Sequence, residues 1–399
     1  MAAGRSGNDG ILEAVALDKA FNVTVPTAIR FGCGVSAEIV PALPDRTRRV
    51  ALLRGTRALA ADGVRDALAR GNVSHREVIC SGEPSVATVN DAVGQLAHDN
   101  IDAVISVGGG SVIDTGKAVA FCLGHKRSLS KGLSDEPASL LSRPGPTVCI
   151  AIPTTAGTGA EVTANAVLDI PERHAKVSLR GRALFPTAAF VDPDLLKSAP
   201  TSVLLASGMD AIVQTIEAYT SNAATPFSDA LTALNIPLGI RALQHILAGD
   251  PPALAWQDLA WTSLTSGIAL ANGGLGAAHG IASIIGGRYA APHGALCGRL
   301  LVPVLRQNIK SAASDSAAQK LRQCAAHLSE AFPPAPDTEL FSGFEAWQER
   351  QGLARLKDYG VRADDLPSIA QDSASASSSR KNAVSLKPDE FLDILKDAL

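Results

Sequence analysis

The sequence of 399 residues has a net charge of −3 and a hydrophobic fraction of 46%. This length provides for about two or three domains with large buried cores. Because there is no basic block, the charge argues against nucleic-acid binding, and no apolar run is long enough to span a bilayer.

The cysteines and the first residues indicate a cytoplasmic protein. The six cysteines are scattered without CxxC spacing, as is usual for reduced thiols. Residues 1–10 are Gly-rich and polar, and they lack the apolar core of a signal peptide. We therefore expect a cytoplasmic protein that binds neither nucleic acid nor a membrane.

The first half of the chain alternates predicted strands with predicted helices. Residues 1–20 are expected to form a flexible arm and residues 21–34 a strand pair. Short apolar stretches predict strands at residues 49–53, 75–80, 103–107, 148–152 and 188–191. Helical periodicity predicts helices at residues 58–70, 86–100 and 111–123. This alternation is typical of a parallel α/β sheet.

The second half changes to long Ala- and Leu-rich helices. They are expected at residues 206–221, 228–247, 253–271 and 388–399. The sequence therefore predicts an α/β domain at residues 21–200 and an all-helical domain at residues 201–399.

Gly108, Gly109 and Gly110 follow a predicted buried strand and open the next helix. Ser111 is expected to cap that helix, with Asp114 at the capping-box position. Free backbone N–H groups and the helix dipole would favour an anion such as pyrophosphate. The spacing matches neither the GxGxxG fingerprint nor the P-loop. An ordinary glycine turn is the alternative, and we favour phosphate binding.

A second polar loop, at residues 153–161, also follows a predicted buried strand. Thr154, Thr155 and Thr158 supply hydroxyl groups there, and small neighbours allow close approach of a ligand. A plain polar loop is the alternative. Two such loops at strand ends are what an open α/β ligand site requires.

His279 and His293 lie on either side of a predicted break. Gly286 and its neighbouring glycine are expected to end the first helix, and Pro292 imposes an extended step. Imidazoles that arrive from different backbone directions suit a metal site, although two buried, hydrogen-bonded histidines would explain the stretch equally well.

Asp210 follows Ser207 at the expected start of the first long helix, where it could be a capping-box acid. Gln214 lies one turn further on the same face. A carboxylate here would complete an Asp/His/His metal set with His279 and His293.

Together these segments resemble the iron-containing (group III metal-dependent) alcohol dehydrogenase family, whose fold is dehydroquinate synthase-like. The matching motifs are GGGSVIDTGK at 108–117, PTTAGTGAEVT at 153–163, GMDA at 208–211, IEAY at 216–219, GLGAAH at 274–279 and PHG at 292–294. The resemblance implies an N-terminal dinucleotide-binding domain, a C-terminal helical domain and an active site in the cleft between them.

The resemblance implies hydride transfer between NADP or NAD and a small aldehyde or alcohol at Fe²⁺ or Zn²⁺, which acts as a Lewis acid. The implied metal positions are Asp210, Gln214, His279 and His293. Asp210, His279, His293 and Ser283 are the catalytic candidates. We also expect a homodimer.

Cofactor contacts are expected around the two loops and after the second strand. The candidates are Gly55, Thr56, Arg57, Gly108, Gly109, Gly110, Ser111, Asp114, Thr154, Thr155, Thr158 and Lys176. Gly55 stands where the family often has an acidic residue. This change favours NADPH, because no carboxylate repels a 2′-phosphate and Thr56 or Arg57 could bind one.

Two positions depart from the family pattern, since Gln214 and Ser283 stand where histidines are usual. A metal-independent reductase of the maleylacetate reductase type is therefore an alternative, although its Tyr-Ala-Gly-Ser-Glu loop is absent. A nucleotide-binding relative without turnover and a dehydroquinate-synthase-type lyase are further alternatives. Arg180 or Arg288 could pair with an anionic substrate.

Overall fold

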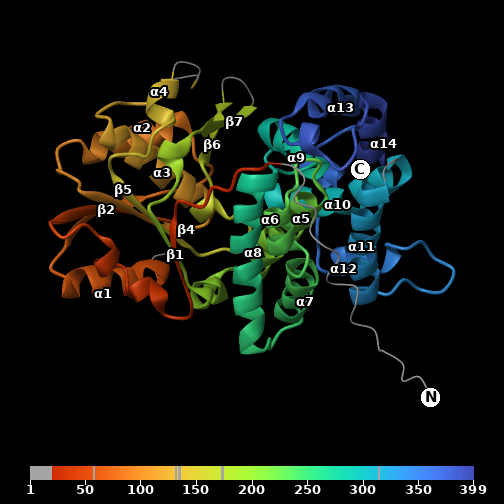
Figure 1. The fold of residues 1–399 in the computed structure, drawn as a ribbon, viewed down its shortest axis with the longest axis horizontal. Coiled ribbons are helices and arrows are strands. Elements are labelled where there is room, and N and C mark those ends of the chain that lie inside the picture. Colours follow the sequence, from red (N-terminus) through yellow and green to blue (C-terminus); the bar gives the residue numbers. More distant parts are fainter. Residues whose placement is uncertain (1–19, 57–58, 131–132, 134–135, 172–174, 313–314) are drawn as a thin grey trace.

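The structure, a computed structural model, describes residues 20–56, 59–130, 133, 136–171, 175–312 and 315–399. The expected flexible arm, apart from Ala20, and the cofactor candidate Arg57 lie outside the described residues. The chain forms an α/β half and a helical half that lie side by side (Figure 1).

The N-terminal half is built on a six-stranded sheet with the order β1-β8-β5-β4-β2-β3, in which every pairing is parallel. Its strands are β1 (Ala28–Phe31), β2 (Arg49–Arg54), β3 (Ser74–Ile79), β4 (Ala103–Gly108), β5 (Val148–Pro153) and β8 (Ala188–Val191). The predicted parallel α/β fold is confirmed. Residues 21–34 contribute one strand, β1, and the prediction of a strand pair there was wrong.

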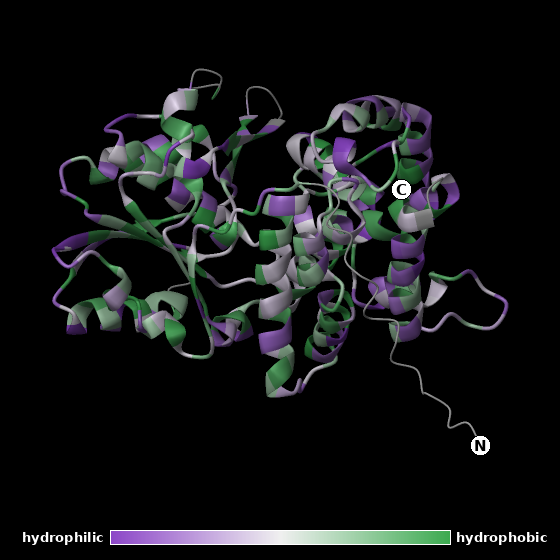
Figure 2. Ribbon diagram, in the orientation of Figure 1, coloured by the Kyte–Doolittle hydropathy of each residue, from purple (hydrophilic) through white to green (hydrophobic). Residues whose placement is uncertain are grey.

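Helices cover both faces of this sheet (Figure 1). On one face α1 (Asp62–Arg70) packs on a core that includes Leu52 and Ile105, and on the other α2 (Val86–Leu96) and α3 (Gly110–Gly124) pack on Leu53 and Val104. Figure 2 shows hydrophobic residues along the strands. Burial on both faces is the reason that the strands are continuous apolar runs.

An antiparallel pair, β6 (Asn165–Ile170) and β7 (Ala175–Arg180), was not predicted. Ala166, Leu168 and Leu179 of this pair belong to the core that also contains α3. The short helix α4 (Ala138–Leu141) follows α3 in the chain.

Ten α-helices form most of the described part of the C-terminal half. They are α5 (Thr201–Thr220), α6 (Pro226–Thr232), α7 (Asn235–Leu247), α8 (Ala253–Gly273), α9 (Ala277–Arg288), α10 (His293–Ser311), α11 (Asp315–Ala331), α12 (Ser342–Arg350), α13 (Leu366–Ser375) and α14 (Pro388–Ala398). They share one continuous hydrophobic core.

Several helix boundaries differ from the prediction. The helix expected at residues 228–247 is two helices, and Pro237 lies in the first turn of α7, where proline is tolerated. α5 begins at Thr201, so Ser207 and Asp210 lie inside it, and the capping-box reading of Asp210 was wrong. α9 continues through Gly286 to Arg288.

The continuation of α9 through two glycines has a packing explanation. Glycine permits a helix end without imposing one, and inside a helix it costs about 1 kcal/mol relative to alanine. Ile281 and Ile285 of α9 are fully buried in the core, and their burial offsets that cost.

Among the described residues, no single helix has the length and apolar character needed to cross a bilayer. α8 and α9, which meet at a bend of 98°, pass that test only when taken together.

Candidate active site

Three helices, α5, α9 and α10, bring the predicted metal ligands together. Gly294 allows α10 to approach α5 closely, because a Cβ atom added there would lie 2.1 Å from the carbonyl oxygen of Ala206 and 2.9 Å from Cβ of Asp210. His293, the first residue of α10, is thereby placed beside Asp210. Pro292 holds the extended step before it, as predicted.

The resulting cluster consists of Asp210, His279, His293 and Cys297, whose potential ligand atoms all lie within 4.8 Å of one another. Oδ1 of Asp210 lies 3.4 Å from Nε2 of His279 and 3.9 Å from Nε2 of His293. The two histidines are therefore neighbours in space although they belong to different helices. Asp210, His279 and Cys297 are buried, and the His293 side chain is 36% exposed.

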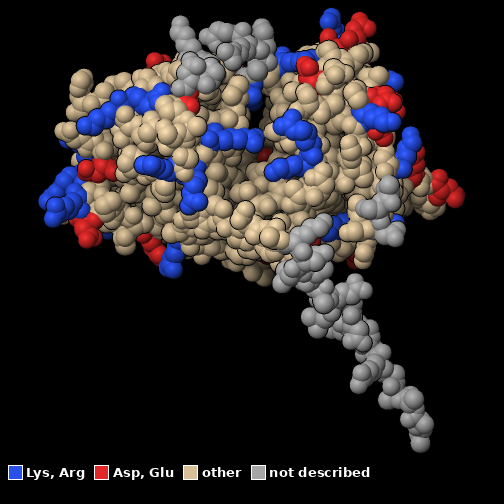
Figure 3. Space-filling view, turned by 45° about the horizontal axis from the view of Figure 1, so that its top comes forward, with Lys and Arg blue, Asp and Glu red and all other residues tan. Residues whose placement is uncertain are grey.

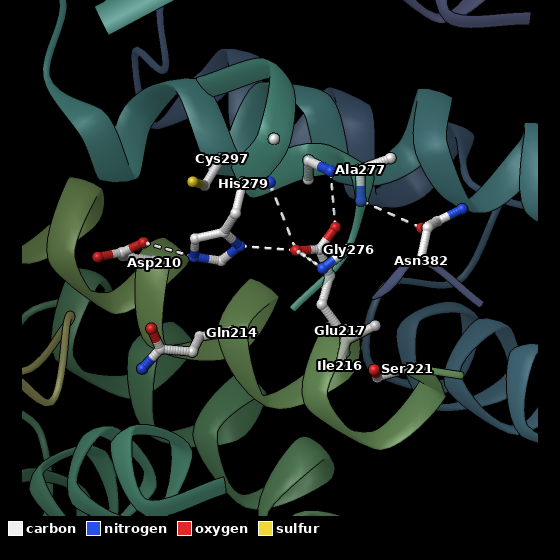
Figure 4. Close-up of polar contacts among 12 residues, drawn as sticks. Asp210, Gln214, Ile216, Glu217, Ser221, Gly276, Ala277, His279, Cys297 and Asn382 are labelled. Atoms are coloured by element: carbon white, nitrogen blue, oxygen red, sulfur yellow. Dashed lines mark hydrogen bonds and ion pairs between the residues drawn. The ribbon is translucent and has the colours of Figure 1, made fainter. Parts of the chain in front are cut away.

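Glu217 on α5 sets the orientation of His279 (Figure 4). Its carboxylate accepts hydrogen bonds from Nδ1 of His279 at 2.7 Å and from the backbone N–H groups of Gly276 and Ala278. A carboxylate only accepts, so Nδ1 carries a proton, and Nε2 is the nitrogen that points toward Asp210. Nε2 of His279 and Oδ1 of Asp210 face each other as an ion pair at 3.4 Å (Figure 4), and among the described residues neither atom makes a hydrogen bond of good geometry.

These two atoms without a hydrogen bond fit a metal site, because buried polar atoms normally make hydrogen bonds. A metal-bound histidine also usually donates its other ring N–H group to a carboxylate, a backbone carbonyl or water, as His279 does to Glu217. Asp210 and the two histidines have the donor types that Zn²⁺ and Fe²⁺ accept.

Electrostatics in the cluster favour a cation. Burial opposes the charged form of Asp210, yet its pKa is lowered because His279 and His293 stabilise the carboxylate. Burial likewise opposes the charged form of His279, but Cys297, Asp210 and Glu217 outweigh it and raise the pKa of His279 well above 6.5. The cluster therefore stabilises positive charge in a buried place.

Gln214 lies one turn beyond Asp210 and is committed to other contacts. Its amide nitrogen donates to the carbonyl oxygen of Thr158 at 3.2 Å and to Oγ of Ser266 at 2.8 Å. Its amide oxygen faces the side of Asp210 and His279 (Figure 4). The role of Gln214 as a metal ligand stays a prediction.

Ser283, the remaining catalytic candidate, lies outside the buried cluster. It is exposed on α9, and its hydroxyl donates to the carbonyl oxygen of Gly280 at 2.8 Å.

The glycine loop ends β4 and begins α3. The helix starts at Gly110 with Gly109 as the N-cap and without a side-chain cap, so the prediction that Ser111 caps it was wrong. Asp114 instead accepts a hydrogen bond from the N–H group of Val167 and forms an ion pair with Lys117 at 2.9 Å. The uncapped N–H groups at the start of α3 suit an anion.

The threonine loop, residues 153–161, packs against the glycine loop, because β4 and β5 are neighbours with Gly108 opposite Pro153. The N–H group of Thr154 donates to the carbonyl oxygen of Gly108. A Cβ atom added to Gly109 would lie 3.2 Å from Oγ1 of Thr155, and one added to Gly110 would lie 2.8 Å from Oγ1 of Thr158. The structure thus brings these cofactor candidates together.

Of the other cofactor candidates, Gly55 lies beside the start of the glycine loop, and Lys176 lies on β7. Gly55 follows β2 and donates its N–H group to the carbonyl oxygen of Val107, and Thr56 is exposed. Lys176 on β7 forms an ion pair with Glu83 at 3.0 Å. Their contact with a cofactor stays a prediction.

Two models of known families match the chain. One is described as iron-containing alcohol dehydrogenase and matches residues 26–193, and the other describes the C-terminal part of the same family and matches residues 204–399. The chain belongs to the iron-containing alcohol dehydrogenase family. The predicted resemblance is thereby confirmed.

Relatives of this family match most of the chain. NAD-dependent methanol dehydrogenase from Bacillus methanolicus is 27% identical over 386 residues, which cover 95% of this chain and 100% of that protein. Lactaldehyde reductase from Escherichia coli strain K12 is 31% identical over 293 residues, which cover 72% of this chain and 74% of that protein. A solved 1,3-propanediol oxidoreductase superposes with a TM-score of 0.82 at 26% identity, covering 96% of this chain and all of that one.

Two residues of the site were missed from the sequence. Cys297 follows His293 by four residues, a spacing that puts both side chains on one helix face. Glu217 follows Asp210 by seven residues, so it also shares a face with it. Either spacing, read along a predicted helix, is a signal that could have pointed to these two residues.

Proposed function

We propose that this chain is a nicotinamide-dependent alcohol dehydrogenase or aldehyde reductase, which transfers hydride between NAD or NADP and a small aldehyde or alcohol. Its family consists of oxidoreductases, and its relatives are named for alcohols and aldehydes. In this proposal residues 21–200 bind the dinucleotide and residues 201–399 hold the metal and the substrate.

The observation that carries the proposal is a hydrogen bond between the threonine loop and Gln214, which lies one turn from Asp210 of the metal-ligand cluster. The carbonyl oxygen of Thr158 accepts a hydrogen bond from Gln214, while the side chain of Thr158 lies against Gly110 of the glycine loop. Hydride transfer requires the nicotinamide and the carbonyl carbon to be held close together. One short loop that touches both sites supports this requirement.

The metal is proposed to be Fe²⁺ or Zn²⁺, held by Asp210, His279 and His293 with Gln214 as a weak or absent ligand. When bound, it supplies a Lewis acid for a carbonyl or alcohol oxygen. Glu217 holds a proton on Nδ1 of His279, so Nε2 is the nitrogen available to a metal, and Asp210 provides the negative charge. The backbone N–H groups at the start of α3 would bind the pyrophosphate of the cofactor.

The substrate is proposed to be small and anionic. Lys and Arg side chains line both rims of a hollow between the two halves (Figure 3), which supports an acidic substrate or cofactor. Of the two arginines considered from the sequence, Arg180 is exposed and contacts Ser178, whereas Arg288 pairs with Asp372 and Ser368. Equal kcat/KM for matched anionic and neutral aldehydes would contradict this part.

The proposal includes a homodimer in the cytoplasm. Light scattering on the purified chain measures the oligomer, and cell fractionation measures the location.

The enzymatic proposal is tested by oxidation of NADH and NADPH with a panel of small aldehydes. The full chain is assayed after chelation and again after loading with Fe²⁺ or Zn²⁺. We expect turnover in the loaded protein and its loss after chelation. Full turnover after rigorous chelation would support a metal-independent reductase, and cofactor binding without any turnover would support a nucleotide-binding relative.

A further inference from the structure

The thiol of Cys297 is the one member of the buried cluster that the proposed function leaves without a role. Cys297 is fully buried, and its Sγ lies 3.6 Å from Nε2 of His293. The other buried cysteines of the described residues, Cys122, Cys149 and Cys324, lie within hydrophobic cores, where burial raises the pKa of each thiol to about 12. Cys297 also belongs to a hydrophobic core, but it differs from these three because its sulfur lies next to a potential ligand atom, Nε2 of His293.

We propose that Cys297 is a metal ligand, which together with Asp210, His279 and His293 completes a set of four and takes the place of Gln214. This inference deepens the proposed function, because it names the ligands and the class of metal at the same site. A thiolate is a softer donor than imidazole or carboxylate, so the set favours Zn²⁺ over Fe²⁺.

Two separations between ligand atoms match those around a common tetrahedral metal, and Oδ1 of Asp210 and Nε2 of His293, now 3.9 Å apart, would move closer together when the metal binds. In a tetrahedral site with metal–nitrogen bonds of about 2.0–2.1 Å and a metal–sulfur bond of about 2.3 Å, sulfur and nitrogen lie roughly 3.6 Å apart. The separation of Sγ of Cys297 and Nε2 of His293 is 3.6 Å. The same geometry places an oxygen and a nitrogen roughly 3.3 Å apart. The separation of Oδ1 of Asp210 and Nε2 of His279 is 3.4 Å.

Independent observations show that this cluster is built to receive a ligand. Oδ1 of Asp210 and Nε2 of His279 belong to side chains that are more than nine-tenths buried, and neither atom makes a hydrogen bond of good geometry within the described chain. Gln214, by contrast, uses its amide nitrogen for Thr158 and Ser266. Cys297 is also favourably placed in sequence, since His293 and Cys297 lie one turn apart on α10.

The test is cobalt spectroscopy on the full chain, chelated and then loaded with Co²⁺ under reducing conditions. A cobalt-bound thiolate gives a sulfur-to-metal charge-transfer band in the near ultraviolet, which oxygen and nitrogen ligands do not give. We expect the band in the parent, in Gln214→Ala and in the buried-thiol control Cys324→Ala. We expect its loss in Cys297→Ser, with Zn²⁺ affinity lowered by more than the roughly 10- to 100-fold that is typical for loss of a residue that only supports a metal ligand.

A second measurement needs no variant. X-ray absorption at the zinc edge of the Zn²⁺-loaded parent should show one sulfur neighbour at about 2.3 Å. Metal bound in stoichiometric amount without a sulfur neighbour, or a cobalt band that persists in Cys297→Ser, would overturn the inference and leave the proposed function intact. A parent that binds no metal would overturn both.

Discussion

Oε2 of Glu217 lies 2.7 Å from Nδ1 of His279 in the buried centre of the helical half. The same carboxylate accepts the N–H groups of Gly276 and Ala278, at the start of α9. One side chain therefore ties α9 to α5 and also selects which nitrogen of His279 remains free. The packing of α9 on α5 therefore also determines that Nε2 is the nitrogen of His279 available to a metal.

Replacing Glu217 with glutamine should weaken metal binding. The neutral amide no longer holds the Nδ1 proton firmly, and loss of such a partner typically costs about 10- to 100-fold in metal affinity. Unfolding free energy should also fall by roughly 1–3 kcal/mol, because buried N–H groups lose a charged acceptor. Calorimetric titration with Zn²⁺ and denaturant unfolding measure the two effects.

Tyr219→Phe is the matched control on the same helix, since the Tyr219 hydroxyl donates to Gln323 instead of the cluster. It should keep the metal affinity of the parent. Unchanged affinity in a folded Glu217→Gln protein would show that Glu217 only holds the helices together.

Adding a methyl group at Gly110 should impair cofactor binding. The new Cβ atom would lie 2.8 Å from Oγ1 of Thr158, so the Thr158 side chain must turn away or the two loops must separate. We expect Gly110→Ala to raise the KM for the nicotinamide cofactor, with metal content unchanged. Gly63→Ala on α1 is the control, because no atom lies within 4 Å of its added Cβ. An unaltered KM in Gly110→Ala would mean that the loop is only a turn.

A carboxylate at Gly55 should shift cofactor preference toward NADH. An added Cβ there meets only Cγ2 of Val112 at 3.9 Å, so the substitution fits the fold. An aspartate would repel the 2′-phosphate of NADPH. The ratio of kcat/KM for NADPH to that for NADH should fall in Gly55→Asp, whereas Gly55→Asn, of equal size, should change it less. Equal ratios in the two variants would indicate that charge at this position does not select the cofactor.

Glu161 in the threonine loop should make stability depend on pH. Burial raises the pKa of its carboxyl from 4.5 to about 7, against the lowering effects of a backbone hydrogen bond and of Lys117. The folded protein therefore binds more protons than the unfolded chain between about pH 4.5 and 7, and its unfolding free energy falls as pH rises through this range. The pKa change corresponds to about 3 kcal/mol.

Glu161→Gln removes this titration, so its unfolding free energy should fall less than that of the parent between pH 5 and about pH 7. Denaturant unfolding at several pH values compares the two proteins. Parallel pH profiles would contradict a raised pKa at Glu161.

Much of the fold could be predicted because buried parallel strands and amphipathic helices leave simple patterns. β2, β4, β5 and β8 are short apolar runs, and their predicted bounds are close to the observed ones. The β6 and β7 pair was missed because its residues mix charged and apolar side chains. Its apolar residues are buried against α3, a contact that the sequence pattern does not show.

The site was partly predictable for the same kind of reason. Pro292 marks the step that separates His279 from His293, and the structure brings both rings to Asp210. The nitrogen of His279 that is available to a metal is set by the contact of Nδ1 with Glu217. The sulfur of Cys297 reaches the cluster because α10 approaches α5 closely at Gly294. Such three-dimensional relations do not follow from sequence spacing alone.

The central claim is that hydride transfer depends on a divalent metal held by Asp210, His279 and His293. Its most direct measurement is metal content together with aldehyde-dependent NADPH oxidation for the parent, His279→Ala, His293→Ala and Gln214→Ala. The two histidine variants should lose both metal and turnover, and Gln214→Ala should keep a substantial part of each. Full turnover in rigorously metal-free parent protein would contradict the account.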